Sequence, residues 1–195
     1  FKFMHRYLFV LGREWKLSAA EVFSVFGGDY EFLTPEICLK KFHEKIDDPE
    51  KLQNRLGGTI KIAEIFDEAD SLKDVESKII GYLNKISDEK CIFAISTYNI
   101  PSGSNNFLKK LLKNTKNALR YKGKVRFLNK PGKNVRSVAV FEEKLHEKGT
   151  DIVIFKKGDE FLLAKTVSVQ NFKKYSVRDY DRPARDTKSG MLPPK

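Results

Sequence analysis

The sequence DPEKLQNRLGGTIKIAEIF, residues 48–66, contains the signals of a helix followed directly by a strand. Asp48 can accept hydrogen bonds from the free N–H groups of a first helical turn, and Pro49 suits the first helical position because no N–H is needed there. Gly57 and Gly58 then end the helix. Thr59–Phe66 is rich in β-branched and apolar residues, which predicts a strand. The succession indicates a fold in which helices and strands are mixed.

The residues before this stretch contain a similar succession. Apolar strand-like runs occupy Phe3–Leu11, Tyr30–Leu33 and Ile37–Phe42. Ser18 precedes Glu21 by three positions, the spacing of a capping box, and Gly27-Gly28 ends the helix that follows. The glycine pairs mark either a duplicated split βαβ unit or two unrelated helix ends. The order β-α-β-β-α-β predicts a ferredoxin-like domain over residues 1–67, whose thin core we expect to pack against its neighbour.

Residues 68–171 are expected to form a second, mixed α/β domain, so that the whole chain is α+β. The expected helices open at Ser71 and Asp74, run from Asn105 to Tyr121, and start at Asn134 with Val138, Phe141 and Leu145 inward; the expected strands are Cys91–Ile95, Lys124–Leu128, Thr150–Phe155 and Phe161–Val169. Lys156-Lys157-Gly158-Asp159 joins the last two strands as a hairpin turn.

Positive charge is concentrated in this second part. The chain of 195 residues has 37 Lys and Arg against 26 Asp and Glu, a formal charge of +11. Residues 1–70 contain 10 basic and 13 acidic side chains, whereas residues 71–195 contain 27 and 13. The excess of basic residues therefore lies entirely after residue 70, and it favours an anionic partner.

One window, residues 102–136, contains basic residues and no acidic one. Its eleven basic residues are Lys109, Lys110, Lys113, Lys116, Arg120, Lys122, Lys124, Arg126, Lys130, Lys133 and Arg136. Solvated helix faces usually mix both signs, so this window favours nucleic acid over a merely solubilising surface. Pro131-Gly132 beside the expected helix start at Asn134 favours a phosphate-binding loop over an ordinary capped helix in a basic loop. Tyr98 and Tyr121 could stack on bases, whereas Phe127 suits the core better.

Other classes of protein are excluded or disfavoured by what the sequence contains. The apolar runs are too short to span a membrane, and no signal-peptide pattern follows the N-terminus. Cys38 and Cys91 have neither metal-ligand spacing nor a disulfide framework, so we expect a reducing, cytoplasmic setting and no metal. No cluster of residues looks catalytic, and the oligomeric state stays open.

The C-terminal residues carry the most specific signal. They include Thr166-Val167, Gln170, Tyr175-Ser176, Arg178-Asp179, Arg182-Pro183, Asp186 and Gly190-Met191-Leu192-Pro193-Pro194-Lys195. This pattern resembles the linker of THUMP-domain tRNA guanine-N2 methyltransferases of the archaeal and eukaryotic type. Earlier segments are also similar to that family: Leu17-Ser18-Ala19-Ala20-Glu21, Leu56-Gly57-Gly58-Thr59-Ile60-Lys61-Ile62, and Ser137-Val138-Ala139-Val140 leading to Lys144-Leu145.

The resemblance implies a ferredoxin-like domain followed by a THUMP domain that binds the 3′ CCA end of tRNA. Residues 172–195, with Arg178, Asp179, Arg182 and Asp186, would then lead to a Rossmann-like methyltransferase domain that uses S-adenosylmethionine. The sequence departs from the family in lacking a glycine-rich cofactor loop and an Asp-Pro-Pro-Tyr type motif. We therefore assign no catalytic residue and no cofactor to these residues, and expect them to be a piece of a longer enzyme that binds tRNA but does not methylate alone.

Two alternatives remain. The same pair of domains precedes the catalytic domain of thiouridine synthetases, although the linker pattern favours a methyltransferase. The chain could also be a stand-alone RNA-binding adaptor that ends at Lys195. Coding sequence downstream of Lys195 would distinguish these hypotheses.

Overall fold

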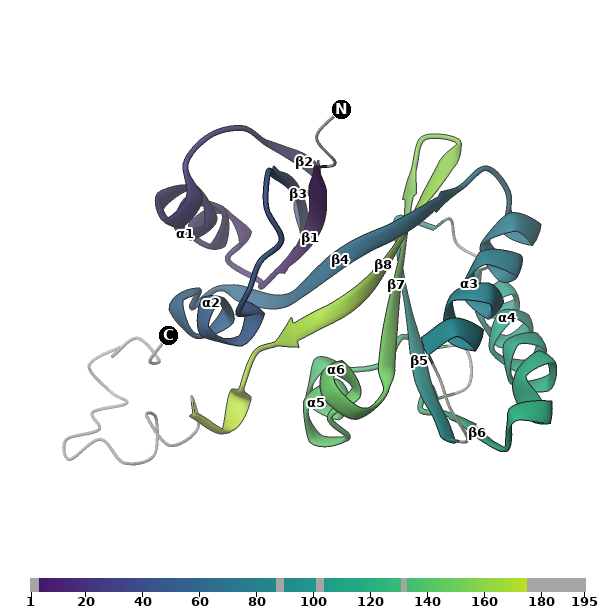
Figure 1. Cartoon of the computed structure of the whole chain (residues 1–195). Helices are drawn as coiled ribbons and strands as arrows, with labels where there is room; N and C mark the ends of the chain where they lie inside the picture. Colours follow the sequence, from purple (N-terminus) through teal and green to yellow (C-terminus); the bar gives the residue numbers. More distant parts are fainter. Residues whose placement is uncertain (1–3, 87–89, 101–103, 131–132, 175–195) are drawn as a thin grey trace, which may run out of the picture.

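The computed structural model describes residues 4–86, 90–100, 104–130 and 133–174. Their strands form one mixed eight-stranded sheet in the order β2-β3-β1-β4-β8-β7-β5-β6 (Figure 1). Helices pack on this sheet, which confirms the predicted α+β class. Among the described residues, no helix has the length and apolar character that crossing a bilayer would require.

The first half of the sheet has the predicted β-α-β-β-α-β order. Its elements are β1 (His5–Leu11), α1 (Trp15–Phe26), β2 (Tyr30–Thr34), β3 (Ile37–Phe42), α2 (Pro49–Arg55) and β4 (Thr59–Ala69). β1 lies between β3 and β4 and is antiparallel to both, while β2 pairs with the outer side of β3. The order β2-β3-β1-β4 is that of a ferredoxin-like unit, which confirms the prediction from the two helix ends.

The two helix starts in this half differ in how they are capped. The Asp48 side chain accepts a hydrogen bond from Lys51 N at 2.8 Å, as predicted for an N-cap. The capping box at Ser18 is wrong, because α1 begins at Trp15 and Ser18 is buried inside it, donating to the carbonyl of Glu14. A serine inside a helix can satisfy its hydroxyl in this way, by bonding to the carbonyl four residues earlier.

The second half contains the remaining elements. These are α3 (Leu72–Ile86), β5 (Lys90–Tyr98), α4 (Ser104–Leu119), the 3₁₀ turn Arg120–Lys122, β6 (Lys124–Phe127), α5 (Ser137–Glu142), α6 (Leu145–Lys148), β7 (Thr150–Lys157) and β8 (Glu160–Val169). β5 is parallel to both β6 and β7, and β7 and β8 form the predicted hairpin. Ser71 caps α3 by accepting from Asp74 N, as expected.

Helices cover both faces of the second half of the sheet (Figure 1). α3 and α4 pack against one face, which presents Phe93, Ile95 and Ile154. α5 and α6 pack against the other face, which presents Ala94 and the other strand side chains that point away from α3 and α4. This arrangement follows from strand geometry, because successive side chains point to opposite faces.

A shared core joins the two halves. Leu8 and Leu39 in the first half pack in one buried cluster with Phe155 and Leu162 in the second. The face of the first half that α1 and α2 leave uncovered is therefore buried against β7 and β8, as expected for a unit with a thin core of its own. β4 pairs with β8 along most of its length, so the expected boundary at residue 67 falls within a paired strand, and the division into two domains stays a prediction.

Candidate nucleic-acid interface

The basic residues of α4 lie on the side of the helix that faces away from the sheet. Leu108, Leu111 and Leu112 are at most 2% exposed and join the core, whereas Lys109, Lys110 and Lys113 are exposed, as is Arg120 in the turn that follows α4. The predicted amphipathic helix is thus confirmed. At about 1.5 Å per residue, its 16 residues separate the two ends by about 24 Å.

Residues 128–130 and 133–136, between β6 and α5, form what we call the anchored segment. Two asparagine side chains hold it to the edge of β5. The Asn129 amide accepts from Ile95 N at 2.9 Å and donates to Ile95 O at 2.7 Å. The Asn134 amide accepts from Thr97 N at 2.9 Å and donates to Thr97 O at 2.7 Å. Side-chain amides thereby take the place of a backbone ladder along an edge that would otherwise be unpaired.

This anchored segment differs from the prediction at its helix. Asn134 is not the N-cap, because its side chain pairs with Thr97. The helix α5 begins only at Ser137, and its N-cap residue is Arg136. Val138 was expected inward but is 40% exposed, and Lys144 adopts a left-handed conformation that separates α5 from α6. The six residues of α5 offer a much shorter helix than the one expected for a phosphate site.

Lys130, Lys133 and Arg136 lie on the anchored segment and are exposed. The segment leaves β6 after Phe127, which pairs with Phe93 in the middle of β5, and runs beside Ile95 and Thr97 towards the carboxyl end of β5. From these neighbouring parallel strands the chain departs to opposite faces, to α4 after β5 and to α5 after β6. Such a divergence creates a crevice at the strand ends where α/β proteins commonly bind ligands. Pro131-Gly132, also expected at this site, lies outside the described residues.

The structure spreads the eleven basic residues over the second half, with groups at its two opposite ends. The start of α4 and the anchored segment lie at the carboxyl ends of β5 and β6. Arg120, Lys122 and Lys124 lie at the opposite end, where α4 finishes and β6 begins. The window that is continuous in the sequence therefore does not form a single compact cluster.

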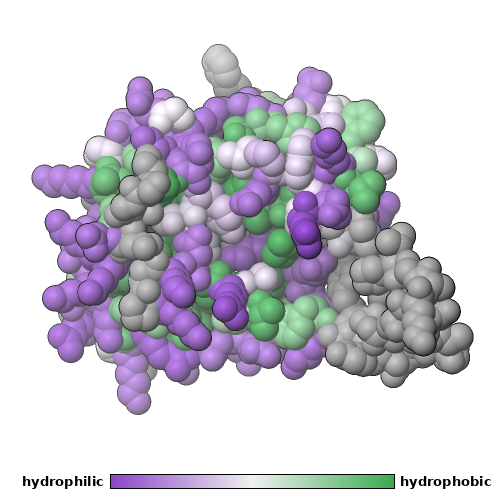
Figure 2. Space-filling model, turned by 180° about the vertical axis from the view of Figure 1, so that it is seen from behind, coloured by the Kyte–Doolittle hydropathy of each residue, from purple (hydrophilic) through white to green (hydrophobic). Residues whose placement is uncertain are grey.

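Three of the eleven have intramolecular partners that explain their presence. Arg126 forms an ion pair with Glu143 at 2.9 Å, Lys116 lies 5.8 Å from the centre of the Phe127 ring, and Lys122 donates to the carbonyl of Asn84. Within the described part of the chain, no ion pair is formed by the other eight, which are Lys109, Lys110, Lys113, Arg120, Lys124, Lys130, Lys133 and Arg136. Figure 2 shows long hydrophilic side chains projecting from the end of the molecule that carries α3 and α4.

A pocket of about 460 Å³ lies beside the anchored segment and is lined by residues of both halves, including Arg13, Trp15, Tyr98 and Val135. Burial and the nearby carboxylate of Asp151 raise the pKa of Tyr98 far above its usual value. Because Arg13 and Trp15 are more than 80 residues from Tyr98 in the sequence, spacing alone did not predict this pocket.

The other two aromatic candidates differ in burial. Phe127 packs against Phe93 in the core, with ring centres 6.1 Å apart. Tyr121 is 73% exposed and could stack on a base, although it lies at the far end of α4.

Gln170, in the described part of the C-terminal motif, is anchored to the first half. Gln170 donates from its backbone to Ile60 O at 2.8 Å and from its side chain to Gly57 O at 2.9 Å, so it is bound to the Gly-Gly segment of the first half. Arg178, Asp179, Arg182 and Asp186 lie outside the described residues.

Comparison with known proteins gives a likeness in fold only. No protein-family model and no curated protein matches the chain. TrmN from Thermus thermophilus superposes with a TM-score of 0.50 at 12% identity, over 90% of this chain and 50% of TrmN. PH1313 from Pyrococcus horikoshii gives a TM-score of 0.47 at 12% identity, over 83% and 53%. A 4-thiouridine synthetase in complex with RNA and ATP gives 0.45 at 10%, over 86% and 42%.

The chain thus spans about half the length of these solved proteins. Its sheet resembles the N-terminal ferredoxin-like and THUMP region of THUMP-containing enzymes, which confirms the fold that the sequence motifs imply.

Proposed function

We propose that this chain is the tRNA-binding portion of an S-adenosylmethionine-dependent tRNA guanine-N2 methyltransferase, and that its second half binds the 3′ CCA end. The observation that carries the proposal is the anchored segment with exposed Lys130, Lys133 and Arg136 at the carboxyl ends of β5 and β6. Binding a flexible single strand costs less entropy when the protein groups are already fixed.

The charge of the interface supports a nucleic-acid ligand. Eight exposed basic side chains have no ion-pair partner in the described ranges, and their mutual repulsion across the second half falls when an anion neutralises them. The single-stranded end of a tRNA offers phosphates for these cations and unstacked bases for the nearby pocket that contains Tyr98.

The methyltransferase assignment rests on the resemblance of the linker, and the methyl donor would be bound by a separate Rossmann-like domain. Sequence following Lys195 that encodes a glycine-rich loop after a strand, and then an Asp-Pro-Pro-Tyr type motif, would support it. An ATP-binding domain of the thiouridine synthetase kind in that place would overturn it.

Titration of the purified chain with tRNA tests the binding proposal. The triple variant Lys130→Ala, Lys133→Ala, Arg136→Ala should bind tRNA about tenfold more weakly at moderate salt, because each lost phosphate contact removes a counterion-release contribution. Removing the CCA nucleotides from the tRNA should weaken the binding of the unaltered chain to a similar degree.

The matched control is Lys41→Ala, Lys51→Ala, Arg55→Ala, which removes the same charge from exposed positions on β3 and α2. If both triple variants bind equally, the attraction is that of net charge alone and the proposed interface is wrong. If trimming the CCA end has no effect, the chain does not recognise the 3′ end.

A further inference from the structure

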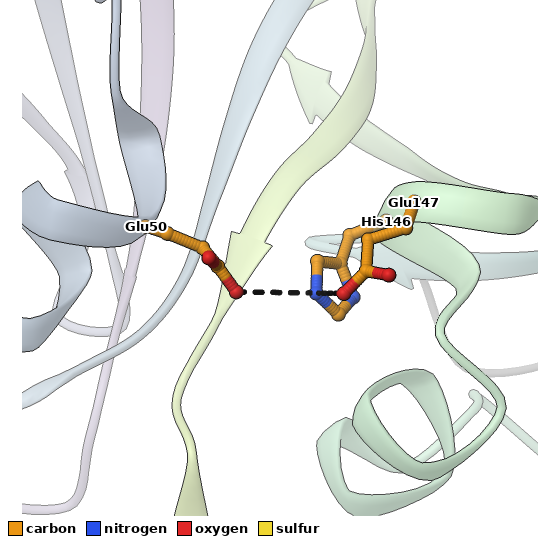
Figure 3. A group of neighbouring side chains, drawn as sticks. All are labelled: Glu50, His146 and Glu147. Carbon is orange, nitrogen blue, oxygen red and sulfur yellow. Dashed lines mark ion pairs between the residues drawn. The ribbon is translucent and has the colours of Figure 1, made fainter.

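Three metal-ligating side chains meet between the two halves of the molecule. Glu50 belongs to α2 in the first half, and His146 and Glu147 belong to α6 in the second. Figure 3 shows Glu50 reaching from α2 towards the imidazole of His146, with the Glu147 carboxylate beside the same ring. One ligand atom from each residue lies within 4.8 Å of the others.

The distances in this group are close to those of a coordination shell. His146 Nε2 lies 3.4 Å from Glu147 Oε1 and 4.0 Å from Glu50 Oε1. Ligand atoms about 2.0–2.2 Å from a tetrahedral zinc ion are about 3.3–3.6 Å from one another. The pair on α6 already has this separation, and the Glu50 side chain, 68% exposed, has the freedom to close the remaining distance.

The His146 ring is buried with one nitrogen facing the two carboxylates. Its side chain is 4% exposed, yet its Nδ1 atom is buried without a hydrogen-bond partner, and its Nε2 atom is directed at the two carboxylates. The ring stacks on Phe141, with 12° between the ring planes, which fixes its orientation. The imidazole therefore presents Nε2, the nitrogen that would bind the ion, to both carboxylates.

We propose that Glu50, His146 and Glu147 bind a divalent zinc ion that bridges α2 and α6. One imidazole nitrogen and two carboxylate oxygens form a mixed donor set that suits zinc, whereas magnesium and calcium prefer oxygen alone. Three protein ligands leave the fourth position to water, which can enter because the group borders an open pocket of about 510 Å³.

A zinc ion here would fix the relative position of the two halves. The chain leaves β8 at the same place, where Phe172 packs on Phe141 and Lys174 lies near Asn54. The ion would therefore also stabilise the start of the segment that follows β8, independently of any RNA.

The test is a zinc titration of the chain without an affinity tag, after treatment with a chelator. We expect one zinc ion per chain, a higher midpoint of thermal unfolding in excess zinc, and no such effect of magnesium. Cobalt in place of zinc should give the strong visible absorption of a tetrahedral site.

Variants then locate the ion. Glu50→Gln and Glu147→Gln should each weaken zinc binding by about tenfold or more, since even the loss of an outer hydrogen bond costs that much. Both residues are exposed, so the fold should persist. Glu142→Gln, an exposed glutamate that lines the same pocket, is the matched control. Less than one equivalent of zinc, or an affinity unchanged in either Glu50→Gln or Glu147→Gln, would overturn the proposal.

Discussion

The Nζ atom of Lys61 lies 2.8 Å from Asp151 Oδ2, and the two side chains are only 2% and 0% exposed. Lys61 comes from β4 and Asp151 from β7, so the pair connects the two halves of the sheet. Ser96 accepts from Lys61 at 3.2 Å, and Thr166 donates to Asp151 at 2.6 Å. The hydroxyls complete the hydrogen bonds that make a buried ion pair tolerable.

Removing one partner of this pair should be far more damaging than removing both. Lys61→Met or Asp151→Leu alone leaves an uncompensated buried charge and should lower the free energy of unfolding by about 3–5 kcal/mol. The double variant should lose clearly less than the sum of the two, as urea denaturation can measure. Additive losses would mean that the two charges do not depend on each other.

Gly58 should tolerate no side chain. A Cβ atom there would lie 2.1 Å from Ser18 Oγ and 2.8 Å from Ser18 Cβ, so Gly58→Ala should cost about 1–3 kcal/mol of stability. Gly81 in α3 is the matched control, because a Cβ there meets nothing within 4 Å and Gly81→Ala should stabilise the helix by about 0.5–1 kcal/mol. Thermal unfolding of both variants should therefore shift in opposite directions; a shift of the same sign would contradict the packing at Gly58.

The contact at Gly58 also shows what the sequence could and could not predict. Helix ends and strands were predictable because glycine pairs, Asp48 and alternating apolar residues act locally. The role of Glu21 was not, since its carboxylate accepts from Gly58 N at 2.7 Å, a partner 37 positions away. The spacing of three positions between Ser18 and Glu21 predicts a capping box, but the partners of both side chains are set by the folded chain and not by this spacing.

The candidate interface was predictable in the same uneven way. The basic character of residues 102–136 is a property of composition, and the amphipathic helix follows from periodicity. How the basic residues are distributed between two ends of the fold depends on the length of α4. The role of Asn134 depends on where the edge of β5 lies. Glu50 and His146 are 96 positions apart and form no motif, so only the fold brings them together.

Asn134→Ala should weaken tRNA binding without changing any charge. The Thr97 N–H and carbonyl lose their partners, so the segment with Lys133 should become mobile and bind several-fold more weakly, with a loss of about 1 kcal/mol in stability. Asn114→Ala, which removes an amide that bonds to Glu76 between α3 and α4, is the matched control. Equal losses of tRNA affinity in both variants would show that the segment is not positioned by Asn134.

Cys38 should be unreactive in the folded protein near neutral pH. Burial raises the pKa of this thiol to about 11, so its thiolate fraction at pH 8 is about one in a thousand. Native protein should react slowly with a disulfide reagent, and protein in urea should expose two thiols at once. Because the unfolded thiol loses its proton first, stability should also fall between about pH 9 and pH 11. Rapid modification of Cys38 at pH 8 in the native state would contradict its burial.

The two ends of the basic surface should contribute differently to tRNA binding. Lys133→Ala, Arg136→Ala and Lys124→Ala, Arg120→Ala each remove one lysine and one arginine from exposed positions, so net charge is equal in the two double variants. If the crevice at the carboxyl ends of β5 and β6 binds the single-stranded end, the first variant should lower the slope of log affinity against log salt by about 1.4, at about 0.7 for each phosphate contact. The second should leave the slope nearly unchanged. The reverse order would place the RNA at the far end of α4, beside the exposed ring of Tyr121.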